Sequence, residues 1–312
     1  MVEISQNISK AAEQLRAGGI VAFATETVYG LGGLAADGKA VARIYDAKGR
    51  PEFNPLITHL YSEADAFEHG ITTSIAEKLA EAFWPGPMTL ILKKRDDSSV
   101  SDLACAGLDT IALRVPKHQM ARALIQEVGA GIVAPSANKS GRISPTRTAH
   151  VASQFDKEID LILEGGDCQH GLESTIIDVT SHTAIIRRPG PISRTEIEAV
   201  IGPLPDAPPT VNDSAPNAPG QLTSHYAPQG TVRLNRTCKQ NGAFYIGFGR
   251  ASDAISDINL SRSGDLIEAA ATLFSALHAA DAADAKFIDV APIPNSGLGE
   301  AICDRLQRAA AP

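Results

Sequence analysis

The chain has 312 residues, of which 44% are apolar and 21% are charged, and its formal net charge is −8. This is the composition of an ordinary soluble globular protein, and the length allows two domains at roughly 100–200 residues each. The acidic balance argues against broad, charge-driven binding of nucleic acid. No apolar run reaches the ~20 residues that span a bilayer, and the N-terminus has no signal-peptide pattern, so a cytoplasmic protein without membrane attachment is expected.

Cysteine usage points to no metal centre and no disulfide framework. The chain has four cysteines, and they are widely dispersed along the sequence: Cys105, Cys168, Cys238 and Cys303. They form neither a zinc-ligand spacing nor a Cys-x-x-Cys pair, so we expect ordinary reduced thiols. No metal site built from protein side chains is predicted.

Residues 1–204 are predicted to form an α/β domain. Helical spacing is found at residues 8–17, 38–47, 74–82, 120–128 and 148–155. Strands are expected at residues 20–24, 56–60, 88–93, 110–115, 131–134, 161–164, 175–179 and 184–188. Because strands outnumber helices, a mixed twisted sheet with helices packed against it is favoured over a simple doubly wound sheet.

The composition changes abruptly after this domain. Six prolines lie between Gly202 and Pro219, with Asp, Asn and Ser among them. Such a segment cannot build a core, so residues 205–229 are predicted to be a linker, extended where the prolines cluster. The linker ends in Ser224-His225-Tyr226-Ala227-Pro228, whose side chains offer more hydrogen-bond donors than a linker requires.

Residues 230–312 are predicted to form a second, smaller α/β domain. Strands are expected at 232–234, 243–248 and 287–290, and helices at 266–280 and 298–310. This alternation indicates a Rossmann-like parallel sheet. Gly247-Phe248-Gly249 carries only a weak dinucleotide signal, because the third glycine and the immediately following helix are missing.

Two polar triplets carry most of the chemical information. Lys48-Gly49-Arg50 offers a point charge, a planar guanidinium fork and a glycine that lets a ligand approach. Ser136-Ala137-Asn138 follows an apolar, strand-like segment. Together the triplets suit the oxygens of a nucleoside triphosphate. A solvated turn remains the alternative for Lys48-Gly49-Arg50 taken alone.

Arg114 is the most informative single cation. It lies within an apolar strand, where an unpaired guanidinium is costly, so it needs a buried carboxylate or a ligand. It belongs to a locally basic stretch, since residues 105–150 hold six Lys and Arg residues against two acids. The stretch suggests a pocket for a small anion, with a structural ion pair or a solvated basic face as the alternatives.

The sequence shows no apparatus for covalent catalysis or for a standard phosphate-binding loop. It contains no Gly-x-Ser-x-Gly elbow and no GxxxxGK[ST] motif, and no histidine is paired by sequence with a nucleophile. These absences favour catalysis by positioning and charge neutralisation, as in phosphoryl or nucleotidyl transfer.

Taken together and in order, seven motifs resemble those of the Sua5/YrdC/YciO family. The linker and second domain match the longer Sua5-type branch, so the resemblance covers nearly the whole chain. The motifs are Thr27-Val28-Tyr29-Gly30-Leu31, Lys48-Gly49-Arg50-Pro51 with Asn54-Pro55-Leu56, Pro85-Gly86-Pro87 with Thr89-Leu90, Arg114-Val115-Pro116, Ala134-Pro135-Ser136-Ala137-Asn138, Glu173-Ser174-Thr175 and Arg188-Pro189-Gly190-Pro191.

The resemblance implies L-threonylcarbamoyladenylate synthase activity, a nucleotidyl transfer. L-Threonine, bicarbonate and ATP would give threonylcarbamoyl-AMP and pyrophosphate, for the N6-threonylcarbamoyladenosine at position 37 of tRNAs. Mg²⁺ is expected to bind with ATP. The implied partners also include a downstream threonylcarbamoyl transferase machinery, with tRNA contact at most indirect or weak.

Site residues are carried over by motif. Lys48 and Arg50 are expected to offset charge on the departing pyrophosphate, as catalytic residues. ATP would be contacted by Arg50, Asn54, Thr110, Ser136, Asn138, Ser144, Arg188 and Tyr226. L-Threonine would be held by Thr27, His59, Arg114, Ala134 and Ser174. The linker, with Tyr226, is predicted to close the site and keep water from the product.

One departure from the family pattern leaves roles open at the linker. Members often carry a basic residue before Ser-His-Tyr, where this chain has Gln221-Leu222-Thr223. Phosphate contact there could fall to Ser224, His225 or Tyr226. Two other functions stay open on the sequence: an RNA-binding module, disfavoured by the net charge of −8, and a nucleotide sensor without turnover.

Overall fold

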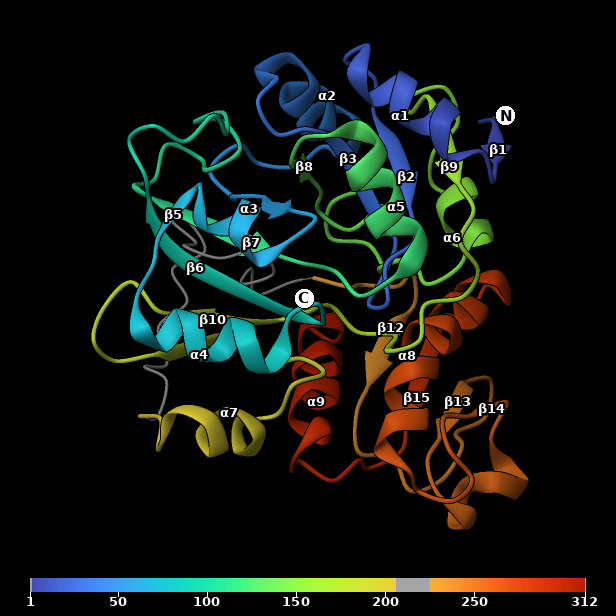
Figure 1. Cartoon of the computed structure of the whole chain (residues 1–312). Coiled ribbons are helices and arrows are strands. Elements are labelled where there is room, and N and C mark those ends of the chain that lie inside the picture. Colours follow the sequence, from blue (N-terminus) through green and yellow to red (C-terminus); the bar gives the residue numbers. More distant parts are fainter. Residues whose placement is uncertain (1, 206–224, 312) are drawn as a thin grey trace.

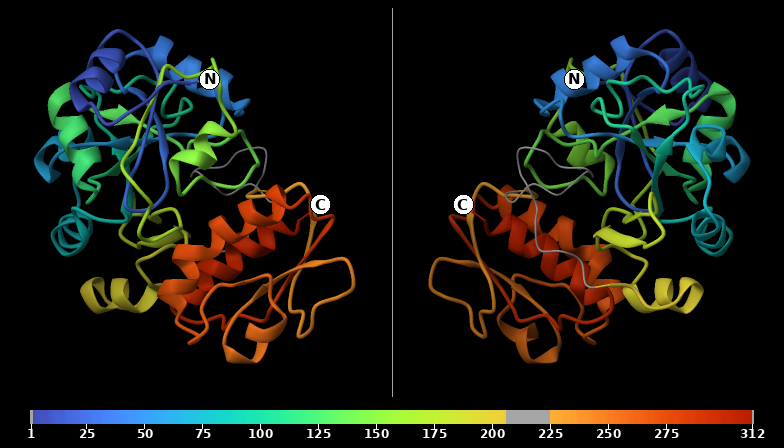
Figure 2. Two further views of the ribbon diagram at one scale, coloured as in Figure 1. Left: turned by 90° about the vertical axis from the view of Figure 1, so that its right-hand side faces the viewer. Right: turned by 90° about the vertical axis from the view of Figure 1, so that its left-hand side faces the viewer.

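The structure is a computed structural model that describes residues 2–205 and 225–311 (Figure 1). The chain forms a larger body with a mixed sheet and a smaller one with a parallel sheet. Helices α8 (Leu266–Ala282) and α9 (Leu298–Ala309) belong to the smaller body and lie on its side that faces the larger one (Figure 2). Most of the predicted linker, residues 206–224, lies outside the described residues. Over the described ranges, no helix is both long enough and apolar enough to cross a membrane.

Within residues 2–205, eleven strands form one sheet. They are β1 (Ile4–Ser5), β2 (Val21–Phe23), β3 (Gly30–Leu34), β4 (Ile57–His59), β5 (Gly70–Ile71), β6 (Met88–Lys94), β7 (Thr110–Arg114), β8 (Ile132–Val133), β9 (Leu161–Leu163), β10 (Thr175–Asp178) and β11 (Ile185–Arg188). The order is β1-β9-β2-β3-β8-β4-β7-β6-β10-β11, with β5 paired to β6. Pairs β4–β7 and β6–β10 are parallel, whereas β6–β7 and β3–β8 are antiparallel. The predicted mixed sheet is confirmed.

The helices of the larger body cover this sheet. They are α1 (Ile8–Arg16), α2 (Gly38–Lys48), α3 (Glu63–Phe67), α4 (Ser74–Phe83), α5 (Gln119–Val128), α6 (Thr148–Ala152) and α7 (Arg194–Ile201). Amphipathic spacing explains their faces: Ala11, Ala12 and Leu15 of α1 are fully buried. Helix α1 packs against α5, and α4 against α7.

Strand β3 is absent from the strands predicted from the sequence. Its sequence Gly-Leu-Gly-Gly-Leu resembles a turn, yet it pairs with β2 and β8. The reason is close packing, because a Cβ on Gly32 would lie 2.7 Å from Cε1 of Phe23. Glycine is therefore used here for space, and packing overrides its low strand propensity.

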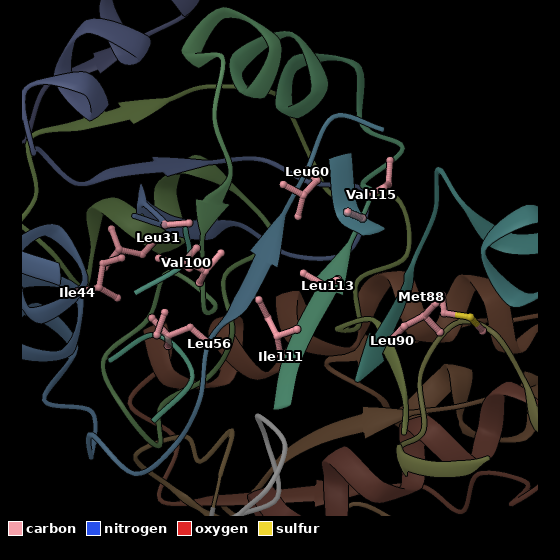
Figure 3. Close-up of a cluster of buried hydrophobic side chains, with 14 of the residues drawn as sticks. Leu31, Ile44, Leu56, Leu60, Met88, Leu90, Val100, Ile111, Leu113 and Val115 are labelled. Carbon is pink, nitrogen blue, oxygen red and sulfur yellow. The ribbon is translucent and has the colours of Figure 1, made fainter. Parts of the chain in front are cut away.

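The main core lies on one face of the central strands (Figure 3). Leu90 on β6 is paired in register with Leu113 on β7. Ile111 and Leu113 project from the same face of β7 because strand side chains alternate with period two. All three side chains are at most 2% exposed. This packing fixes the strand ends that carry the polar side chains of the candidate site.

The smaller body has a four-stranded parallel sheet in residues 225–311, ordered β12-β15-β13-β14, which confirms the predicted parallel α/β fold. Its further elements are β12 (Thr231–Arg233), β13 (Phe244–Gly247), η1 (Arg250–Ile255), β14 (Ile258–Asn259) and β15 (Phe287–Val290). Val28, Ile143 and Leu172 of the larger body belong to the same apolar cluster as Leu273 and Phe274 of α8. The two bodies therefore share a core.

Candidate functional site

A small cavity lies where several strand ends of the large sheet meet the second body. Its lining includes Thr27 from the β2–β3 connection, His59 at the end of β4, Arg114 at the end of β7, and Tyr226. Its volume is about 40 Å³. That is room for a few water molecules and not for a nucleotide.

At one end of the cavity, Arg114 forms a buried ion pair. Its Nη2 donates to Oε1 of Glu26 at 2.6 Å, its Nη1 donates to Oγ1 of Thr27 at 2.9 Å, and both charged side chains are at most 4% exposed. The carboxylate of Glu26 also accepts from the backbone N–H of His118. The sequence required a carboxylate or a ligand for Arg114, and Glu26 is that carboxylate. We call the set Glu26, Thr27, His59 and Arg114 the Arg114 end.

The pKa values at the Arg114 end follow from burial and charge. Burial alone would raise the pKa of Glu26, but the charge and hydrogen bond of Arg114, with backbone N–H groups, lower it to about 2. Burial and the nearby Arg114 charge lower the pKa of His59 to about 3. At neutral pH this end therefore holds one anion, one cation and a neutral imidazole, and it is close to electroneutral.

The two signature triplets meet through Lys48. Its Nζ donates to the backbone oxygens of Ser136 at 2.6 Å and Asn138 at 2.5 Å. The ammonium is buried, and burial, with the charges of Arg50 and Lys139, holds the pKa of Lys48 well below its usual range. Lys48 does not line the cavity in this conformation; it ties helix α2 to the loop that carries Ser136.

Arg50 lines the cavity from the loop that follows α2. Its guanidinium donates to the backbone oxygens of Asn54 and Pro55, and at 2.6 Å to Oδ1 of Asn54. Burial, partly offset by Tyr45 and reinforced by Arg188, lowers the pKa of Arg50 to about 10. The oxygens that hold Lys48 and Arg50 are uncharged. The resulting excess of positive charge favours a bound anion.

Arg188 extends this basic region at the end of β11. Its Nε and Nη2 donate to the backbone oxygen of Ser174, and Nη2 also reaches Oγ of Ser174 at 3.1 Å. Burial is the main reason that the pKa of Arg188 falls to about 10. We call Lys48, Arg50 and Arg188 the Arg50 end.

Tyr226 and His225 form the wall contributed by the described end of the linker. Tyr226 is 1% exposed and its ring packs against Phe274 of α8 and the imidazole of His225. Its backbone φ is +64°, a left-handed conformation that bulky residues seldom adopt. Such conformations cost of order 1–3 kcal/mol and persist where surrounding contacts hold them.

The structure brings most of the predicted residues to this cavity. The lining includes all predicted threonine contacts and part of the ATP set: Thr27, His59, Arg114, Ala134 and Ser174, then Arg50, Ser136, Arg188 and Tyr226. Lys48, Asn54, Asn138 and Ser144 stand behind it, each within hydrogen-bond reach of a lining residue or its loop.

Thr110 is the predicted residue that the structure does not bring to the cavity. It lies at the first position of β7, opposite Lys93 of β6. Arg114 is four residues further along the same extended strand, about 13 Å away at ~3.3 Å per residue. The ATP contact expected of Thr110 therefore has no support in this geometry.

Sequence reasoning missed Glu26 and Glu173 as site residues. Glu26 stands between Thr25 and Thr27, directly after a buried strand, and that position was a usable signal for the partner of Arg114. Glu173 opens the motif from which only Ser174 was chosen, and it lines the cavity. Arg305, in α9, gave no signal, because its contact with Glu173 joins residues 132 positions apart.

Unpartnered polar atoms gather around the cavity. Within residues 2–205 and 225–311, four of the buried side-chain atoms without a hydrogen-bond partner are Asn54 Nδ2, His59 Nδ1, Asn138 Oδ1 and His225 Nδ1. Buried polar groups are normally satisfied, so each such atom needs an explanation. A polar ligand that enters the cavity would provide hydrogen-bond partners to those atoms within its reach.

The described residues contain no group of three or more His, Cys, Asp or Glu side chains that could hold a metal ion. The carboxylates nearest the cavity are already engaged, Glu26 by Arg114 and Glu173 by Ser144 and Arg305. The residues therefore do not fit a protein-held magnesium ion.

Comparison with known proteins agrees with this arrangement. The family model described as telomere recombination, Sua5_yciO_yrdC, matches residues 13–190. The chain belongs to the Sua5/YciO/YrdC family. A second model, the C-terminal domain of threonylcarbamoyl-AMP synthase, matches residues 192–311.

Family relatives match over the whole length. The threonylcarbamoyl-AMP synthase of Bacillus subtilis strain 168 is 39% identical, covering 99% of this chain and 95% of the relative. The threonylcarbamoyl-AMP synthase of Pyrococcus abyssi is 39% identical, and the match covers 96% of this chain and 92% of the relative. The crystal structure of P. abyssi Sua5 complexed with L-threonine superposes with a TM-score of 0.87 at 35% identity, covering 99% of this chain and 97% of that one.

Proposed function

We propose that this protein is a threonylcarbamoyl-AMP synthase, a nucleotidyltransferase that converts L-threonine, bicarbonate and ATP into threonylcarbamoyl-AMP and pyrophosphate. The observation that carries the proposal is one cavity with two unlike ends. The Arg114 end is close to electroneutral and suits a zwitterionic amino acid, whereas the Arg50 end is cationic and suits a triphosphate. The name shared by the relatives and the threonine-bound P. abyssi structure support it.

At the Arg114 end, Arg114 receives the carboxylate of threonine in a charge-assisted hydrogen bond. Glu26 holds the guanidinium in place from behind, at 2.6 Å. His59 stays neutral because its pKa is about 3, so its unpartnered Nδ1 is able to accept a hydrogen bond from the substrate. Thr27 and Ser174 supply hydroxyl groups beside it, and Ala134 supplies backbone at the end of β8.

The chemistry then follows in two steps. The threonine amine attacks the carbon of bicarbonate and water leaves, which gives an N-carboxylate. An oxygen of this carbamate attacks the α-phosphorus of ATP, the bond to the bridging oxygen breaks, and pyrophosphate departs. Arg50 and Arg188 offset the negative charge that builds on the leaving group, and Lys48 holds the Ser136 loop in place.

Magnesium belongs to this proposal as a companion of the nucleotide. Phosphate oxygens of ATP would hold it, where it would neutralise charge on the pyrophosphate. ATP and bicarbonate are likewise proposed substrates. The product is an activated carbamoyl group, and an enzyme that transfers it to tRNA is the proposed recipient, with tRNA contact to this protein indirect.

Closure over the product is the proposed role of the segment with Tyr226. The cavity of about 40 Å³ is too small for ATP, so His225 and Tyr226 must move outward when the nucleotide enters. Their return would exclude water from a readily hydrolysed adenylate. The remaining linker residues, 206–224, lie outside the described residues.

The deciding experiment is mass-spectrometric detection of threonylcarbamoyl-AMP made by the purified full-length protein. Mg²⁺, ATP, L-threonine and bicarbonate should yield the adenylate together with one equivalent of pyrophosphate, and omission of either threonine or bicarbonate should abolish both products. A folded protein that binds threonine and nucleotide but forms no adenylate would be a sensor, and the proposal would be wrong.

A further inference from the structure

Helix α9 of the second body places an arginine against the wall of the cavity. Arg305 is 0% exposed and is among the largest fully buried side chains of the described residues. A buried guanidinium is costly unless its donors are satisfied and its charge is paired. The contacts of Arg305 are therefore informative about what holds it there.

Those contacts reach into the larger body. Nε donates to Oε2 of Glu173 at 2.8 Å, Nη2 donates to the backbone oxygen of Pro189 at 3.0 Å, and Nη1 pairs with Asp304 at 2.5 Å. The guanidinium carbon also lies 5.3 Å from the ring centre of Tyr226. The guanidinium of Arg305 thus joins α9 to Glu173, to the turn at Pro189 and to the ring of Tyr226.

Each of these segments carries a part of the proposed nucleotide site. Glu173 lines the cavity and accepts a 2.5 Å hydrogen bond from the hydroxyl of Ser144. Pro189 directly follows Arg188. The turn is tightly packed, since a Cβ on Gly190 would lie 2.4 Å from the backbone nitrogen of Thr175. A shift at Pro189 is therefore transmitted to Arg188 and β10.

Charge explains why Arg305 is needed. Burial would raise the pKa of Glu173, but the charge of Arg305, with that of Arg188 and the bond from Ser144, lowers it. The hydrogen bond that Ser144 donates to Glu173 is strongest while that carboxylate is ionised and held in place. Without Arg305, Arg188 would be drawn toward Glu173 as the remaining strong positive partner.

We infer that Arg305 is a positioning residue of the active site, supplied by the second domain, which fixes Glu173, Ser144 and the turn after Arg188 for binding of the ATP phosphates. The inference rests on the proposed function. Arg305 itself touches no substrate. Through Arg305, the second domain positions residues of the larger body that bind the nucleotide.

The test compares Arg305→Gln and Arg305→Lys with the wild-type full-length enzyme, using pyrophosphate release with ATP and threonine varied in turn. For Arg305→Gln the KM for ATP should rise roughly tenfold, as expected for losing a charge-assisted bond. The KM for threonine should change less than about threefold, because the bonds of Arg305 do not reach the Arg114 end. Arg305→Lys should be intermediate, since an ammonium keeps the charge but not the fork.

Arg233→Gln is the control. It breaks another arginine–carboxylate pair of the second body, with Asp289 at 2.7 Å, and neither residue lines the cavity. Both KM values should stay at wild-type levels. A merely structural role for Arg305 would lower thermal stability and the active fraction while leaving both KM values unchanged, and that outcome would overturn the inference. If Arg305→Gln does not fold, a wild-type KM for ATP in Arg305→Lys overturns it equally.

The route through Glu173 is tested by a double variant. Arg305→Gln with Glu173→Gln should raise the KM for ATP no further than the worse single variant, because both changes break one connected unit. If the KM for ATP of the double variant rises by the product of the two single-variant factors, the inference is contradicted.

Binding separates this inference from the proposed function. Titration with a non-hydrolysable ATP analogue and with L-threonine needs no turnover. If the wild-type protein binds both but forms no adenylate, only the proposed reaction fails. If the wild type and Arg305→Gln bind the analogue equally, the inference fails and the proposed function stands.

Discussion

The Arg114 end and the Arg50 end of the cavity solve the burial of charge in opposite ways. Arg114 is neutralised inside the protein by Glu26 at 2.6 Å. Lys48 and Arg50 are also buried, but carbonyl and amide oxygens hold them. A charge that is paired internally serves the fold as well as the ligand, whereas a charge held by neutral groups is matched only when an anion arrives.

The sharpest way to break this comparison is Arg50→Met. Turnover should fall by about 10²–10³-fold, because a preorganised positive charge at the leaving group is removed. The loss of stability should be smaller than for Glu26→Gln, since among the described residues the guanidinium of Arg50 is held by neutral oxygens. Pyrophosphate release and urea unfolding measure the two effects. A larger stability loss than for Glu26→Gln would mean that Arg50 is mainly structural.

Glu26→Gln changes the Arg114 end of the cavity. It leaves Arg114 buried without its carboxylate, which should lower the free energy of unfolding by about 3–5 kcal/mol. The control is Lys10→Gln, which breaks the exposed Lys10–Glu3 pair and should cost at most ~1 kcal/mol. Urea denaturation of both variants gives the comparison; equal losses would show that the Arg114 pair contributes no more than a surface one.

Acid should also destabilise the fold through the Arg114 end, as Glu26→Gln does. The pKa of Glu26 is lowered from 4.5 to about 2 in the folded protein. Its pairing with Arg114 therefore contributes fully above pH 4.5, and this contribution is lost as the pH falls from 4.5 to 2. The loss is about 3 kcal/mol by linkage. It is measured as the difference in unfolding free energy between wild type and Glu26→Gln across that range, and a pH-independent difference would contradict it.

The smallest effect is expected at Thr110. Thr110→Ala should leave the KM for ATP unchanged, because Thr110 lies at the far end of β7 from Arg114. Ser136→Ala is the partner variant, and since Ser136 lines the cavity it should raise that KM by about 3–10-fold, the range for one neutral hydrogen bond. A raised KM for Thr110→Ala would restore the ATP contact expected from the sequence.

Local patterns in the sequence predicted most elements, because alternation and helical spacing report burial directly. Strand β3 was not predicted, because its glycines allow close packing against Phe23 and such a contact leaves no pattern in residue spacing. Helix α7 was not predicted either, although Ser193 and Glu196 form a capping box at its start. Both elements are short, and their burial depends on neighbours remote in sequence.

The site divides in the same way. The requirement of Arg114 for a carboxylate followed from its apolar strand. The position of Glu26 after a buried strand made it a candidate, but the pairing itself spans 88 positions and became visible only in the fold. The two triplets were recognised as a unit by motif, whereas the bonds from Lys48 to the Ser136 loop became visible only in three dimensions. Residue type predicted the chemistry and folding decided the partners.

Tyr226 belongs to two structures at once, as a wall of the cavity and as a member of the apolar core around α8. Opening the cavity by moving Tyr226 would therefore withdraw a side chain from the core of the second body. The free energy of that core and the frequency of opening are thermodynamically linked. Leu273 and Phe274 do not line the cavity. A cavity-forming substitution at either residue would thus change how often the site opens, and the rate of substrate entry would report on the packing of the second body.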